Sequence, residues 1–116
     1  MAQDKSLTEF FGTGATQTID SVTFQKADLV SKRNPIAFKA IIPTINNSAE
    51  SLFLSLLLSA WENQDTSNDA QFAIFGPEVS LISIVSDGKE TPHEQFIFTV
   101  RVLNKKDVAM PNPNLI

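Results

Sequence analysis

The sequence predicts an α+β fold in which an antiparallel β-sheet, or a small sandwich or barrel, packs on one main helix. Residues 47–64 form an apolar run that opens with a helix-start signal and is long enough for several turns. Residues 79–86 and 95–103 alternate between apolar and other side chains, as strands do, and a turn-forming Asp-Gly pair lies between them. At 116 residues, the chain can bury its own core without a metal or a disulfide.

We expect one domain with an extended arm at each end. The expected bounds are 1–15 for the N-terminal arm, 16–103 for the domain and 104–116 for the C-terminal arm. In the first arm, Ser6 and Glu9 have the spacing of a capping box, which predicts a short helical turn at 7–11. Gly12 would end this turn, and residues 12–14 would form a flexible joint.

Two strands are expected before the main helix. Residues 16–26 have strand composition, with a bulge expected at 19–21 where the alternation slips. Residues 36–42 lie between Pro35 and Pro43, which favours a strand near a sheet edge.

The main helix is expected at about 48–63. Asn47 and Glu50 fit an Asn variant of the capping box. One narrow polar stripe follows, made of Ser51, Ser55, Ser59 and Glu62. We expect this stripe to face water and the side away from the sheet to touch another subunit. Because leucines also alternate over 52–58, a buried strand is the alternative.

The last third of the domain is expected to be mostly β-structure. A short strand at 71–75 would end at Gly76 and Pro77, and a hairpin would follow with a long loop over 87–94. Both strands of this hairpin carry apolar side chains on two faces. We therefore expect both faces to be partly covered.

Composition and charge exclude several classes. The net charge is −4 and the nine basic residues are scattered, so a main role on nucleic acid is not expected. The absence of cysteine excludes disulfides and thiolate chemistry. We find no signal-peptide core, and the apolar run 52–61 is too short to span a bilayer. We expect no membrane partner and a cytoplasmic location in the producing cell, or incorporation into a particle assembled there.

Candidate chemistry is sparse. His93 is the only histidine, and with Glu90 and Glu94 it could offer three ligands to a metal. A solvated hairpin tip explains the same residues better. Residues 12–14 resemble a fragment of a phosphate loop, but the lysine and the preceding strand of that motif are missing. We expect no catalytic residue, no cofactor and no metal.

The excess of apolar surface predicts self-assembly. A helix apolar on about three sides can face only one sheet within a monomer. The arms also carry apolar residues, which gain order only by docking. The candidate subunit interface comprises Phe10, Phe11, Phe53, Leu56, Ala60, Leu115 and Ile116. The partners would be further copies of the chain and other structural proteins.

These features favour a non-enzymatic structural subunit, most of all a virion component of a tailed bacteriophage: a head-decoration, neck or tail-tube protein. The basis is an analogy of layout, without a matching motif. The alternative is a small homo-oligomeric binding module with an apolar pocket between helix and sheet, lined by Trp61, Phe53 and Phe96. For Trp61, core packing is the favoured explanation.

Overall fold

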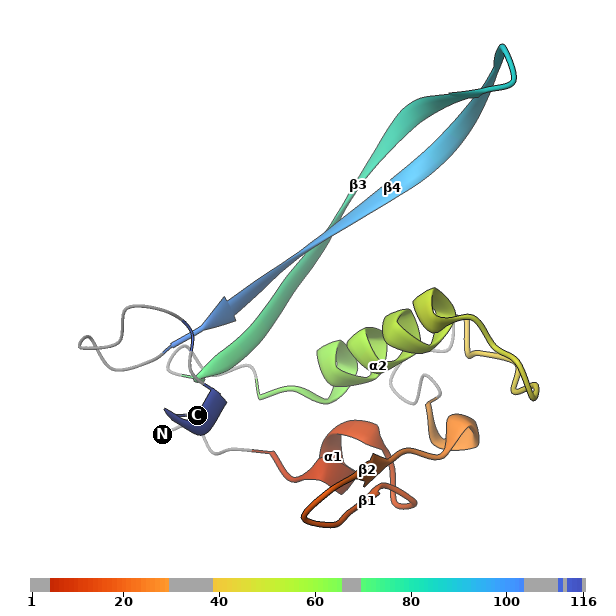
Figure 1. The fold of residues 1–116 in the computed structure, drawn as a ribbon. Coiled ribbons are helices and arrows are strands. Elements are labelled where there is room, and N and C mark those ends of the chain that lie inside the picture. The colour runs from red at the N-terminus through yellow and green to blue at the C-terminus, as the bar shows by residue number, and fades with distance from the viewer. Residues whose placement is uncertain (1–4, 30–38, 66–69, 104–110, 112, 116) are drawn as a thin grey trace. The chain divides into compact units, whose positions relative to one another are not determined.

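The computed structural model describes residues 5–29, 39–65, 70–103, 111 and 113–115, and the chain divides into two compact units, Met1–Gln71 and Phe72–Ile116 (Figure 1). The first unit contains helix α1 (Leu7–Phe11), strands β1 (Thr16–Gln17) and β2 (Val22–Thr23), the 3-10 turn η1 (Lys26–Asp28) and helix α2 (Ala49–Asn63). The second contains strands β3 (Phe72–Ser86) and β4 (Lys89–Val102) and the 3-10 turn η2 (Pro113–Leu115). One main helix and two antiparallel two-stranded sheets confirm the α+β class. The predicted arms and domain bounds stay predictions.

Helix α1 begins with the predicted capping box. The Glu9 amide donates to Ser6 Oγ at 3.2 Å, and the Ser6 amide donates to Glu9 Oε1 at 3.1 Å. Gly12 ends the helix with a φ of 101°, and its amide donates to the Thr8 carbonyl. A side chain rarely adopts this φ, so glycine suits the position.

The segment after α1, expected to be a flexible joint, is a packed turn. The Gly14 amide donates to Asp28 Oδ2 at 2.9 Å, which joins the turn to η1. A Cβ atom at Gly14 would lie 2.5 Å from Gln25 Cγ, and one at Gly12 would overlap the Asp28 side chain. The two glycines are therefore required by the close approach of η1.

Residues 16–26, predicted as one strand, instead form a small hairpin at 16–23 and then enter η1 at Lys26. Thr16 pairs with Thr23 and Gln17 with Val22. The predicted bulge is the turn of this hairpin: the Thr18 amide donates to the Ser21 carbonyl at 2.8 Å, and the hydroxyls of both residues are bonded at 2.9 Å. Side chains of this type favour turns by bonding to nearby main-chain groups.

The second predicted strand, 36–42, lies partly outside the described residues, and no strand is present at 39–42. The main chain is held there by side-chain bonds. Lys26 Nζ donates to the Thr44 carbonyl at 2.6 Å, and Asn47 Nδ2 donates to the Ile42 carbonyl at 3.0 Å.

Helix α2 has the predicted extent but a different cap. The N-cap is Ser48, whose Oγ accepts from the Ser51 amide at 3.1 Å. Asn47 cannot serve as the cap because its Oδ1 accepts from the Thr44 amide at 2.9 Å, which fixes the preceding turn. The alternative of a buried strand at 52–58 is wrong.

The second unit is dominated by a β-ribbon, which we define as β3 and β4 (Figure 1). Two predictions about it are wrong. The strand does not end at Gly76-Pro77, where β3 instead continues through a bulge with two residues opposite Phe98. The expected long loop is a two-residue turn, with φ of 53° at Asp87 and 73° at Gly88. Two positive φ angles match the twist of the flanking strands, so pairing resumes at once with Ser86 opposite Lys89.

In the described parts of the chain, no helix combines the length and apolar character that crossing a bilayer requires.

Candidate assembly surfaces

The C-terminal half of α2 binds the end of α1 through polar side chains. Ser59 Oγ donates to the Phe10 carbonyl at 2.8 Å. Asn63 Nδ2 donates to the same carbonyl at 3.2 Å and to the Ser59 carbonyl at 2.9 Å. The last carbonyls of a helix have no partner inside it, so the end of α1 needs donors from elsewhere.

This contact corrects the prediction that the polar stripe faces water. Ser59 is 2% exposed and Glu62 is 4% exposed, whereas Ser51 is exposed. The stripe is thus wet at its first turn and buried at its last turns. A serine allows closer approach of the two helices than a leucine would, and it supplies the donor.

The aromatic residues of the first arm pack against other aromatic rings of the first unit. The Phe10 and Phe11 rings meet edge to face at a centroid distance of 5.7 Å. Phe11 also meets Phe24, at 4.8 Å and 60°. Such pairs add to the stabilisation from burial alone. Phe10 and Phe11 are half-buried, so the proposed interface residues of this arm have ring partners in their own chain.

The remaining interface candidates differ in exposure. Phe53 is 70% exposed and therefore presents a large apolar side chain at the first turns of α2. Leu56 is half-buried and Ala60 is buried. Leu115 lies in η2, and Ile116 lies outside the described residues. Among the candidates whose side chains the structure describes, Phe53 offers the clearest surface for a partner.

The β-ribbon carries an apolar face along its length. The bulge inserts one residue, so Ile74 and Val79 share a face although they are five positions apart. The apolar residues of this face are Phe72, Ile74, Val79, Leu81, Val85, Phe96, Phe98, Val100 and Val102; Ser83, Glu90, Pro92 and Glu94 share the face near the turn. Leu81 is 77% exposed, Val85 64% and Val79 58%.

The second face of the β-ribbon is also partly apolar. Exposed members are Phe75, Ile82, Ile84 and Ile97. The alternation predicted for both strands is therefore confirmed, while the expected cover on both faces is not present within the described residues. Apolar side chains on two faces of a strand predict burial, whereas these side chains are exposed in the described part of the chain.

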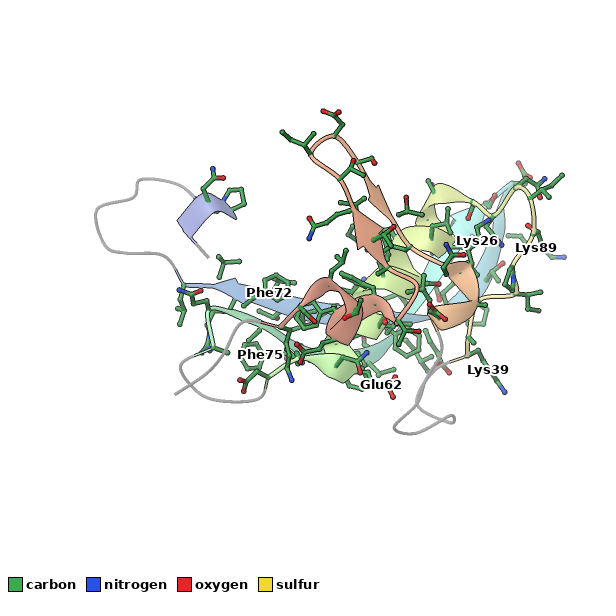
Figure 2. The ribbon with its side chains drawn as sticks, turned by 90° about the horizontal axis from the view of Figure 1, so that it is seen from below. Lys26, Lys39, Glu62, Phe72, Phe75 and Lys89 are labelled. Carbon is green, nitrogen blue, oxygen red and sulfur yellow. The ribbon has the colours of Figure 1, made fainter. Side chains whose placement is uncertain are left out.

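The two ends of the β-ribbon differ in packing. Figure 2 shows Phe72 and Phe75 at one end and Lys89 at the other. Near the first end, Ala73 and Ile74 are buried, and the Arg101 guanidinium carbon lies 5.4 Å from the centre of the Phe75 ring, a cation–π distance. Residues 75–97 around the turn are all exposed. We call residues 75–97 the outer part of the β-ribbon. The side chains of this outer part remain exposed to solvent within the described residues.

The candidate metal ligands lie in β4 and do not converge. His93 pairs with Ile82, whereas Glu90 and Glu94 pair with Val85 and Leu81 on the opposite face. His93 Nδ1 lies 2.9 Å from the Thr91 carbonyl oxygen. The described residues contain no cluster of three or more His, Asp or Glu side chains that could hold a metal ion.

The alternative function, a binding module, stays a prediction. Of the residues expected to line its pocket, Trp61 is half-buried, while Phe53 and Phe96 are exposed.

No protein family matches this chain, and neither does any curated protein or solved structure.

Proposed function

We propose that this protein is a non-enzymatic structural subunit that self-assembles, and that it is a virion component of a tailed bacteriophage. The observation that carries the proposal is the exposed outer part of the β-ribbon, where large apolar side chains lie on both faces. Its partners are further copies of the chain and other structural proteins.

The stability of a lone ribbon supports the first part of this proposal. A two-stranded hairpin is marginal in water and needs a third strand or a packed face. Two edges of unpaired main-chain groups add a tendency to bind other strands. Burying the exposed apolar side chains stabilises an assembly by about 25 cal/mol per Å². A monomer gains nothing from holding these side chains in water.

The virion assignment rests on composition and layout. The chain has no cysteine and only 19% charged residues, which suits a surface that meets other proteins. A long β-ribbon whose residues 75–97 are all exposed is suited to reaching a neighbouring subunit. Such a protein is made in the cytoplasm of the producing cell and then built into the particle.

Solution mass as a function of concentration tests self-assembly. We expect mass to rise with concentration, measured by sedimentation or light scattering, and electron microscopy to show rings, tubes or sheets. A strict monomer at the highest attainable concentration would contradict the proposal.

The genes beside the coding sequence test the virion assignment separately. Neighbours that encode capsid or tail parts support it. If the neighbouring genes were metabolic and the protein formed a discrete small oligomer, the virion assignment would be contradicted. Self-association alone would then be supported.

A further inference from the structure

The two edges of the β-ribbon differ in which main-chain groups they offer. Pro92 has no N–H, so its pair with Ser83 is one that makes no hydrogen bonds across the ribbon. Bonded and non-bonded pairs alternate along an antiparallel ladder. On β3, the residues whose N–H and C=O groups point outward are therefore Val79, Leu81, Ser83 and Val85; on β4 they are Glu90, Pro92, Glu94 and Phe96.

The β4 edge resists the addition of another strand. Pro92 removes one outward donor, and Glu90 and Glu94 place a carboxylate on each side of it. Proline and charge are the devices by which edge strands avoid pairing. Two β4 edges brought together would also place like charges close to each other.

The β3 edge has none of these devices between Val79 and Ser86. Every residue there is uncharged and keeps its N–H, and most are β-branched or leucine. Three of the residues whose main-chain groups point outward, Val79, Leu81 and Val85, are apolar. Their side chains are the most exposed apolar ones of the ribbon. One edge of the same hairpin is closed to pairing and the other is open.

We propose that the β3 edge pairs antiparallel with the β3 edge of a second copy, about a two-fold axis at Ile82. This inference rests on the proposed function and deepens it by naming the surface. The product is a four-stranded sheet in the order β4, β3, β3, β4. A sheet needs three or more strands to be stable by itself, and an isolated ribbon has only two. A two-fold contact uses the same patch on both copies, so the β3 edge must be complementary to itself. The partner that binds this edge is therefore a second copy of the chain.

The register follows from the outward residues. With Ile82 opposite itself, Val79 lies opposite Val85 of the second copy and Leu81 lies opposite Ser83 of the second copy. All four outward positions are then used, with roughly eight main-chain hydrogen bonds across the contact. Glu78, the charged residue beside this segment, faces Ser86 of the second copy, so no carboxylate faces its own equivalent. A different protein partner would be selected by complementary charge, which this edge does not carry.

Cysteine cross-linking of the full chain tests the register, because the natural sequence has no cysteine. In Ile82→Cys, the two thiols lie in a directly opposed, non-bonded pair, with Cα atoms about 4.5 Å apart, within disulfide range. We expect mild oxidation to give a covalent dimer in buffer and not in concentrated urea. Ser80→Cys and Ile84→Cys are matched controls, since four residue steps separate each from its equivalent by roughly 14 Å. Neither should cross-link alone, but a mixture of the two variants should.

A second variant, Leu81→Lys, tests the edge itself. Its ammonium lies opposite Glu94 within the ribbon, so the hairpin should still form, as checked by circular dichroism. A charge on the open edge should abolish the cross-link of Ile82→Cys and lower the solution mass. Equal cross-linking at positions 80, 82 and 84, or none at 82 in a protein that still oligomerises, would overturn this inference and leave the proposed function standing. A natural chain that stays monomeric at all concentrations would overturn both.

Discussion

The hydroxyl oxygen of Ser59 in α2 lies 2.8 Å from the carbonyl oxygen of Phe10 in α1, and the hydroxyl donates the hydrogen bond between them. This bond joins residues 49 positions apart in the chain, so it fixes tertiary structure rather than a local turn. It also explains why a serine stands on a stretch of helix that is buried.

Replacing Ser59 by alanine should destabilise the protein by about 1 kcal/mol, because the Phe10 carbonyl then keeps only the longer bond from Asn63. Urea unfolding followed by Trp61 fluorescence measures the change. Ser55→Ala is the control, since the Ser55 hydroxyl donates only to the Ser51 carbonyl of its own helix. We expect the control to change stability by under about 0.5 kcal/mol. Equal losses in both variants would show that the contact between the helices contributes nothing specific.

Replacing Gly76 by alanine should damage the β-ribbon. Gly76 has a φ of 108°, and an added Cβ would lie 2.7 Å from the Ile97 carbonyl oxygen in β4. Backbone strain and overlap together should cost more than about 2 kcal/mol. Gly88→Ala is the matched control, because Gly88 also has a positive φ but has no atom within 4 Å of the added Cβ. Its expected cost is about 1 kcal/mol. Thermal unfolding compares the two variants, and a Gly88 loss as large as the Gly76 loss would contradict the close approach.

Replacing Ser48 by alanine should cost about 1 kcal/mol and lower the helix content, because the Ser51 amide loses its acceptor. Ser48→Asp should retain stability, since aspartate is as good an N-cap and suits the positive end of the helix. Far-ultraviolet circular dichroism with urea unfolding measures both. If Asn47→Ala, and not Ser48→Ala, reduced the helix signal, the cap would be Asn47 after all.

The pKa of Glu9 lies below its ordinary value of 4.5, chiefly because its carboxylate accepts from the Ser6 amide, and also through the Ser6 side chain and Lys5. A lowered folded pKa means that the contribution of this group is fully present above pH 4.5. It is lost as the pH falls through the lower, folded pKa. A carboxyl-carbon NMR titration of Glu9 should show the low pKa. Ser6→Ala removes the hydroxyl but keeps the main-chain amide of residue 6, so the pKa of Glu9 should rise only part of the way toward 4.5. A full return to 4.5 would contradict the main-chain hydrogen bond as the chief cause.

Local rules predicted the elements whose causes are local. The α1 capping box and its glycine stop, the extent of α2 and the face alternation of 79–86 and 95–103 all follow from spacing within a few residues. The errors arose where two local choices compete. Asn47 and Ser48 are both good caps, and the choice depends on the Thr44 amide, which takes the Asn47 side chain.

Burial was harder to predict than secondary structure. A serine stripe on an apolar helix indicates a wet face, yet its last turns meet α1, and no local pattern records where α1 lies. In the β-ribbon the error runs the other way, from predicted burial to observed exposure. Apolar side chains on two faces predict that both faces are covered, but the described part of this chain does not cover them. The sequence thus predicts which residues share each face of the ribbon, but it does not predict that these faces are exposed.

The bulge at Gly76-Pro77 sets the phase of everything beyond it. With its extra residue, Val79 lies on the same face as Ile74, and the residues of β3 whose main-chain groups point outward include the apolar residues Val79, Leu81 and Val85. Removal of one residue at this point would exchange the two faces of all later positions in β3. The number of residues at Gly76-Pro77 therefore decides which side chains of β3 lie on which face of the ribbon. Inserting or deleting one residue there would alter the contact surface more than many substitutions along the strand would.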